Sequence, residues 1–178
     1  MSVNEDTIKR AQKGDEIAFQ MLFDACASLV FSVCMRYMKD NEEAKDLMQE
    51  VFVKLFSKLK DYNFKGSFEG WLRKMTVFAA IDELRKRKEI IQSLDEAVRP
   101  SLEADHSSVN VLEALAAEDL MILIRGLPRV YGLVFNLYAI EGYKHHEIAQ
   151  MLNISEGTSK SNLHDARRIL KSKLKVIG

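Results

Sequence analysis

Apolar side chains return every three or four positions through much of this sequence, and that repeat limits the folds open to it. Between residues 15 and 60 the spacing is that of helices that bury one face. Only two prolines and eight glycines occur among 178 residues, so few positions stop a helix. Hydrophobic residues make up 47% of the chain, which is enough to bury a core. The sequence therefore predicts an all-α protein.

Composition divides the chain into two helical modules. After about residue 90 the periodicity fades, and Pro100, serines and acidic residues accumulate, as is typical of a linker. We expect an N-terminal helical bundle of residues 1–90, a flexible acidic linker of residues 91–110 and a C-terminal module of residues 111–178. Helix starts are expected at Asn41 and Ser155, as N-caps, and at Pro128, in a first turn.

The formal net charge of zero hides an uneven distribution of charge. Residues 95–128 carry two basic and seven acidic groups, whereas residues 129–178 carry eight and four. A basic patch neutralises phosphates locally, whatever the total charge of the chain. Neutrality therefore does not exclude a nucleic-acid partner.

An aromatic loop interrupts the helical rhythm of the first module. Seven of the fifteen aromatic residues lie between Phe52 and Phe78, and the loop DYNFKGSFEG over residues 61–70 contains two glycines. Rings that alternate with basic side chains suit an unpaired strand, because rings stack on exposed bases and cations hold the backbone. A core role for these rings explains the loop equally well, and for any single ring it is the favoured interpretation.

The C-terminal module has the pattern of a helix-turn-helix. The sequence EIAQMLNIS predicts a short helix and a turn, and a basic helix follows it. On that last helix an apolar stripe is expected to point inward, formed by Leu163, Ala166, Leu170 and Leu174. The opposite face would then meet a DNA major groove through Ser161, His164, Asp165 and Arg168. A solvated polar face is the alternative.

Signatures of enzymes, metal sites and membrane proteins are not found. The sequence has no phosphate-binding loop, no GxGxxG, no GxSxG and no zinc-ligand spacing, so we expect no catalytic residue, metal or cofactor. No run approaches the roughly 18 apolar residues of a membrane span, and the start has no signal-peptide core. A cytoplasmic protein without membrane insertion is expected. Cys26 and Cys34 are interpreted as buried, reduced thiols.

Two stretches resemble bacterial RNA polymerase sigma factors. EEAKDLMQEVFVKLFSKL, FKGSFEGWLRKM and AAIDELRKRK resemble their second conserved region, and LPRVYGLVFNLYAIEGYKHHEIAQMLNISEGTSKSNLHDARRIL resembles their fourth. The short acidic linker between them is similar to that of the extracytoplasmic-function (ECF) subgroup. The resemblance implies a factor that binds core RNA polymerase, directs it to promoter DNA and assists opening. It also implies contacts to the β′ clamp and β flap, regulation by an anti-sigma factor, and no small-molecule substrate.

The resemblance also implies roles for particular residues. The β′ clamp would meet an outward helix face formed by Asp46, Gln49, Glu50 and Val53. Recognition and melting of the minus-ten element would fall to Asn63, Phe64, Lys65, Gly66, Ser67, Phe68, Trp71, Lys74, Phe78 and Arg85. The minus-thirty-five element would be read by Thr158, Lys160, Ser161, His164, Arg167 and Arg168.

Three residues depart from the family pattern. Phe78 stands where the family often has an asparagine, which bears on minus-ten readout. Asn162 and Asp165 stand where arginines are frequent, and we expect the acidic group to lie close to phosphates. Duplex binding by the isolated residues 109–178 is therefore expected to be weak.

Two other functions fit part of the sequence. A stand-alone helix-turn-helix regulator that binds duplex DNA as a dimer would explain residues 128–175. It leaves the aromatic loop and the second-region motif without a role. An adaptor that sequesters a polymerase or sigma surface without opening DNA is compatible with Phe78.

Overall fold

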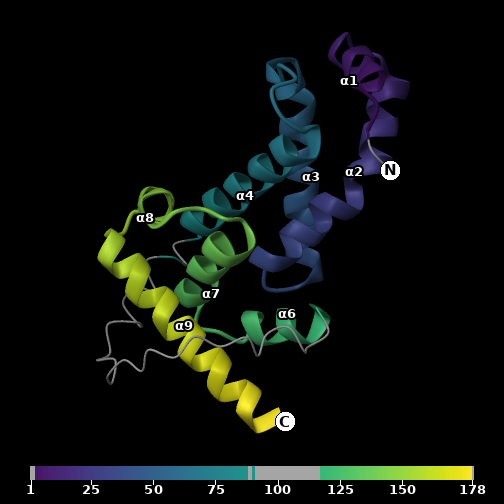
Figure 1. Ribbon diagram of the computed structural model, residues 1–178. Coiled ribbons are helices and arrows are strands. Elements are labelled where there is room, and N and C mark those ends of the chain that lie inside the picture. The colour runs from purple at the N-terminus through teal and green to yellow at the C-terminus, as the bar shows by residue number, and fades with distance from the viewer. Residues whose placement is uncertain (1–2, 88–89, 91–116, 178) are drawn as a thin grey trace. The chain divides into compact units, whose positions relative to one another are not determined.

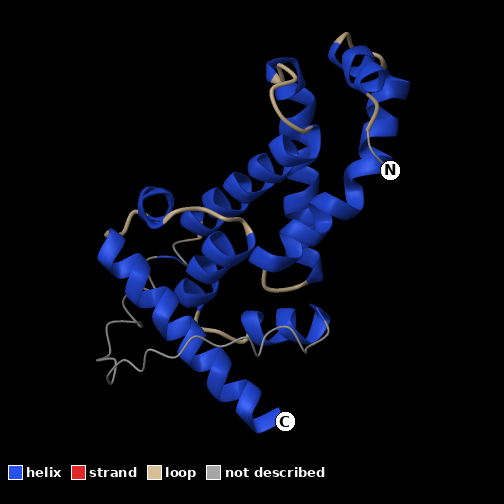
Figure 2. Cartoon of the chain, viewed as in Figure 1, coloured by secondary structure: helices blue, strands red, loops and turns tan. Residues whose placement is uncertain are grey.

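The computed structural model describes residues 3–87, 90 and 117–177, and every regular element in these ranges is a helix (Figures 1 and 2). The all-α prediction is confirmed. The chain forms two compact units, residues 1–83 and 84–178, with the division inside a helix. The predicted linker, residues 91–110, lies outside the described residues, so the module boundaries stay a prediction.

The N-terminal unit contains four α-helices and one short 3-10 helix. They are α1 (Glu5–Gln12), α2 (Glu16–Tyr37), α3 (Asn41–Lys58), η1 (Leu59–Asp61) and α4 (Phe68–Lys86). Side-chain oxygens cap the starts of the first three helices, each satisfying a backbone N–H that the helix leaves unpaired. Asp40, rather than the predicted Asn41, caps α3, because its Oδ1 accepts from the Glu43 N–H at 3.0 Å.

The core of this unit forms between α2 and α3, which lie side by side and antiparallel (Figure 1). Their rings pair in reverse order along the two helices: Phe19 meets Phe56 at 5.0 Å and Phe23 meets Phe52 at 4.4 Å between centroids. Such pairs add about 0.5–1.5 kcal/mol each beyond the apolar area that they bury. The paired rings therefore fix the register of α2 against α3.

Both cysteines lie in α2 and are buried, as predicted. Burial raises the pKa of the Cys26 thiol to about 11 and that of the Cys34 thiol to about 12. The thiolate is the reactive form of cysteine. At neutral pH both side chains are therefore neutral apolar packing groups.

The expectation that no segment has the character of a membrane span is wrong for α2. Among the described helices, α2 is long and apolar enough to cross a membrane by length and composition. A core helix of a soluble protein passes the same test. In this fold Leu22, Val30 and Val33 of α2 are fully buried, so these apolar side chains serve packing.

The C-terminal unit is built from α6 (Ala117–Arg125), α7 (Arg129–Phe135), the π-helix η3 (Asn136–Ile140), α8 (His145–Leu152) and α9 (Glu156–Ile177). Pro128 immediately precedes α7, as its N-cap residue. Asn153 ends α8 in the left-handed conformation, with φ of 54°. Ser155 caps α9 as predicted, because its Oγ accepts from the Thr158 N–H at 2.9 Å. The predicted helix-turn-helix is thus formed by α8 and α9.

Replacing Leu55 by alanine is expected to lower the free energy of unfolding of the N-terminal unit by about 2–5 kcal/mol, because the fully buried side chain leaves a cavity. Val53→Ala, on the exposed face of the same helix, should change it by less than about 0.5 kcal/mol. Urea denaturation followed by circular dichroism measures both values. Equal losses in the two variants would contradict this packing of α3.

Candidate nucleic-acid interface

Tyr62 is the centre of the predicted aromatic loop. Its ring packs against Phe64, Phe68 and Trp71, with centroid distances of 5.0, 5.2 and 5.3 Å. Its hydroxyl donates a hydrogen bond to the Gly66 carbonyl at 2.9 Å, which closes the loop on itself. Tyr62 and Phe68 are buried, so these two rings support the loop from beneath.

The backbone of the loop turns through two residues with positive φ. Phe64 has φ of 62° and Gly66 has φ of 85°, and the left-handed region is unusual for an aromatic residue. Asn63 Oδ1 accepts from the Lys65 N–H at 3.2 Å, and Ser67 Oγ accepts from the Gly70 N–H at 3.1 Å. Polar side chains thereby fix the loop, while Asn63, Lys65 and Ser67 remain exposed.

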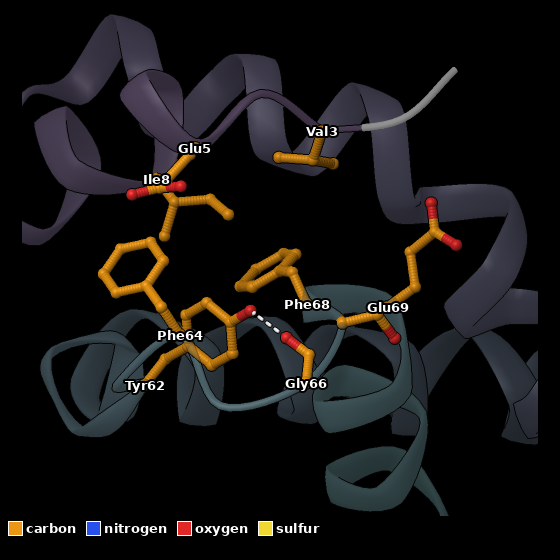
Figure 3. Close-up of a pocket in the computed structure, with 9 residues that line it drawn as sticks. Val3, Glu5, Ile8, Tyr62, Phe64, Gly66, Phe68 and Glu69 are labelled. Carbon is orange, nitrogen blue, oxygen red and sulfur yellow. Dashed lines mark hydrogen bonds between the residues drawn. The ribbon is translucent and has the colours of Figure 1, made fainter.

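A cavity of about 310 Å³ opens beside the loop (Figure 3). Phe64, Phe68 and the Gly66 backbone line one side of it, and residues of α1 line the other. Its volume falls at the lower end of the range for ligand pockets, about 300–1,000 Å³. The combination of aromatic lining and exposed polar groups suits a flat, partly apolar ligand.

The minus-ten residues that the resemblance implies on α4 are only partly directed to solvent. Trp71 is half-buried in the cluster around Tyr62, whereas Lys74 and Phe78 are exposed. Lys74 Nζ lies 5.9 Å from the Phe78 ring centroid, so this ring has a cation beside it. Phe78 is 40% exposed and therefore able to stack on a base. Arg85 lies in the last turn of α4.

The outward face of α3 combines acidic and apolar side chains. Asp46, Gln49, Glu50 and Val53 are all exposed, as the helical periodicity predicted. Phe56 was missed: it lies three residues after Val53 on the same face and is 64% exposed, although Phe19 contacts one edge of its ring. Its spacing from Val53 could have revealed it. Exposed apolar side chains set among charges are typical of a protein contact.

On α9 the predicted groove-facing residues lie mostly in solvent. Lys160, Ser161, Arg167 and Arg168 are exposed, and Thr158 and His164 are half-buried. The inward stripe of Leu163, Ala166 and Leu170 is buried as predicted, and Leu174 is half-buried. A row of three basic side chains thus lies along the exposed side of this helix.

Asn162 and Asp165 do not lie where the sequence placed them. They are 5% and 6% exposed, so neither side chain faces outward. The buried arc of α9 is wide because α7 packs against it, and the Asp165 charge helps raise the pKa of Tyr131 on α7, after the larger effect of burial. Asp165 also pairs with Arg168 at 3.3 Å. The expectation that Asp165 puts negative charge against phosphates is therefore wrong, and it no longer supports weak duplex binding.

A stacked cluster beside α9 was not predicted. The His145 ring lies 4.6 Å from the Tyr138 ring with 23° between the planes, and Arg167 lies over the same tyrosine at 5.7 Å. His145 Nδ1 is hydrogen-bonded to Ser159 Oγ at 2.9 Å. Burial lowers the pKa of His145, the charges of Lys160 and Arg167 lower it further, and Glu156 opposes them. The stack therefore holds a neutral imidazole at neutral pH.

Within the part of the chain that the structure describes, no group of three His, Cys, Asp or Glu side chains is placed to hold a metal ion. The candidate sites are instead three surfaces: the aromatic loop with its cavity, the outward face of α3 and the basic side of α9. The first and third suit nucleic acid, and the second suits a protein.

Comparison with known families identifies the class of protein. The model of Sigma-70 region 2 matches residues 22–90, and the model of Sigma-70 region 4 matches residues 117–170. The first match covers α3, α4 and most of α2, and the second covers α6, α7, α8 and most of α9. The fold and these two regions define a sigma factor of the sigma-70 class.

Relatives and solved structures refine this assignment. The ECF RNA polymerase sigma factor SigW of Bacillus subtilis is 28% identical over 178 residues, covering 94% of this chain and 95% of SigW. The ECF RNA polymerase sigma-E factor of Escherichia coli K12 is 26% identical, with coverages of 96% and 93%. The chain belongs to the ECF subgroup of RNA polymerase sigma factors. The sigma factor RpoE of Bartonella quintana, solved in complex with the anti-sigma factor NepR, has the same fold, with a TM-score of 0.53, 21% identity and coverages of 89% and 97%.

The lowered pKa of His145 predicts an acid-sensitive C-terminal unit. The unfolded chain takes up a proton near pH 6.5 and the folded unit resists it, so stability is lost as the pH falls below about 6.5 towards the folded pKa. His145→Gln, which retains a hydrogen-bonding side chain beside Ser159, should reduce this loss. His146→Gln, at the exposed neighbouring position, should retain it.

Thermal denaturation of both variants at about pH 7 and about pH 5.5 measures this effect. NMR titration of the two rings assigns the midpoint to its residue. An acid loss that is the same in His145→Gln as in the unmodified chain would contradict the assignment.

Proposed function

We propose that this sigma factor binds core RNA polymerase through the outward face of α3, reads the minus-thirty-five element through α9 and captures an extruded minus-ten base at the aromatic loop. The loop carries the proposal most directly. It holds exposed polar groups around a cluster of four rings, beside a cavity that is open to solvent.

Base capture at the loop is energetically feasible. Taking a base out of the stack costs a few kcal/mol. Stacking on an aromatic side chain returns about 1–3 kcal/mol per base. Phe64 and the exposed Phe78 supply rings, while Lys65 and Lys74 supply cations for the phosphates. A factor of this kind assists strand opening with binding energy and leaves phosphodiester chemistry to the polymerase.

The outward face of α3 is proposed to dock on the β′ clamp. An apolar centre with a charged rim is the usual anatomy of a protein interface. Val53, 71% exposed, and Phe56 form the apolar centre. Asp46, Gln49 and Glu50 lie on the N-terminal side of this centre as a polar rim, and the two carboxylates favour a basic partner surface.

The C-terminal unit is proposed to hold promoter duplex. Lys160, Arg167 and Arg168 present cations on one side of α9, and Ser161 and His164 lie among them. Phosphate contacts position such a helix, and side chains at base edges give it specificity. The same unit is expected to contact the β flap, as the family resemblance implies.

An anti-sigma factor is proposed as a further partner. The RpoE structure of Bartonella quintana contains one, and the outward face of α3 offers an inhibitor the surface that polymerase requires. The chain would act in the cytoplasm, and a membrane-bound inhibitor would hold it at the inner membrane.

Replacing Asp46, Gln49 and Glu50 together by alanine is expected to abolish co-elution with purified core RNA polymerase in size-exclusion chromatography. The matched control replaces Glu16, Gln20 and Asp24, two acids and one amide that are exposed on α2. Because these lie on another helix, the control should co-elute like the unmodified chain. If the folded, unmodified chain fails to co-elute, a stand-alone DNA-binding regulator becomes the better explanation.

Arg167→Ala is expected to weaken the binding of holoenzyme to promoter DNA by a similar factor for every promoter sequence. The slope of log affinity against log salt concentration should fall by about one, because one phosphate contact is lost. Arg125→Ala, an exposed arginine of α6 in the same unit, is the control and should leave the slope unchanged. Filter binding across a salt series measures both. An unchanged slope for Arg167→Ala would exclude this phosphate contact.

A further inference from the structure

The cavity beside the loop has a second wall, which is formed by α1 and by Val3 just before it. Val3, Glu5 and Ile8 line the side that faces Phe64 and Phe68 (Figure 3). The family model of region 2 begins at residue 22, so it does not include these residues. The family match therefore assigns no role to α1, although residues of α1 line the cavity beside the loop.

Two hydrogen bonds tie α1 to the start of the loop. Gln12 Nε2 donates to the Leu59 carbonyl at 2.9 Å and to the Tyr62 carbonyl at 2.8 Å. These carbonyls lie at the beginning and immediately after the end of η1, the turn that leads into the loop. Because one amide group holds both, the position of α1 and the path of the loop are set together.

A third contact reaches the loop itself. Lys9 Nζ lies 5.3 Å from the centroid of the Phe64 ring, and Glu5 holds the same ammonium group at 2.5 Å. Ile8, which immediately precedes Lys9 in α1, is buried and lines the cavity. The α1 wall thus offers an apolar surface at its base, which matches the flat face of a nucleotide base, and the Lys9–Glu5 ion pair lies beside Phe64 at its rim.

We propose that α1 completes the minus-ten pocket, so that the extruded base is held between the loop and Val3, Glu5 and Ile8. Gln12 is a positioning residue that keeps this wall against the loop. The inference rests on the proposed function, because it requires that the loop captures a base. It adds an element outside the matched region to the DNA-binding surface.

The test fills the pocket from the α1 side. Val3 precedes the helix and is only half-buried, so Val3→Trp places an indole ring in the cavity without removing a core side chain. Holoenzyme assembled from the full chain is titrated with a single-stranded minus-ten oligonucleotide from a promoter that the holoenzyme selects from random DNA. Val3→Trp is expected to weaken this binding about tenfold or more, the equivalent of one lost stacking contact.

The controls separate the pocket from the fold. Val3→Ala, which leaves the cavity open, should bind the oligonucleotide within about twofold of the unmodified chain. Gln12→Met removes both donors at similar size and should weaken binding, whereas Gln20→Met, at an exposed position of α2, should not. All four variants should bind core polymerase and minus-thirty-five duplex normally.

The outcomes are distinct. Weakened oligonucleotide binding in Val3→Trp and Gln12→Met, with core and duplex binding intact, supports the α1 wall. If Val3→Trp binds the oligonucleotide as tightly as the unmodified chain does, the α1 wall is overturned, but base capture by the loop is not. If the unmodified holoenzyme does not prefer the minus-ten strand to a scrambled strand, base capture fails and the α1 wall fails with it.

Discussion

The packing of rings around Tyr62 is the interaction on which the candidate DNA site depends. Tyr62 joins η1 to the first turn of α4 and fixes the loop between them through the Gly66 carbonyl. Buried aromatic pairs combine a large apolar contact with a preferred geometry. Ordering a loop of glycine and polar residues costs conformational entropy. The contacts between the rings offset this cost in the free protein.

On α3 and α9 the buried and exposed faces differ in chemistry. On α3 the buried face is aliphatic and aromatic, and the exposed face adds Val53 and Phe56 to a set of acidic groups. On α9 the exposed side is basic. A protein with no net charge can therefore present an acidic surface to one partner and a basic surface to another. The two surfaces lie in different units of the chain.

Most helices and the helix-turn-helix were predictable from the sequence, because apolar periodicity and caps such as Ser155 are local signals. The burial of Asn162 and Asp165 was not, because the width of a helix's buried arc is set by what packs against it. The stacking and hydrogen bonding of His145 could not be predicted either, because its partners Tyr138 and Ser159 are seven and fourteen residues away in the sequence. Within the aromatic loop, periodicity could not separate the supporting rings Tyr62 and Phe68 from the exposed groups beside them.

The buried thiols of α2 have a practical consequence. Cys26 and Cys34 are the only cysteines in the sequence, and both belong to the N-terminal unit. A thiol-specific reagent can modify them only after that unit opens, since the folded core excludes the reagent and keeps the thiols protonated. The rate of alkylation therefore reports the opening of this half of the molecule alone. The chain thus contains an intrinsic probe for the opening of its N-terminal unit, independent of the C-terminal unit.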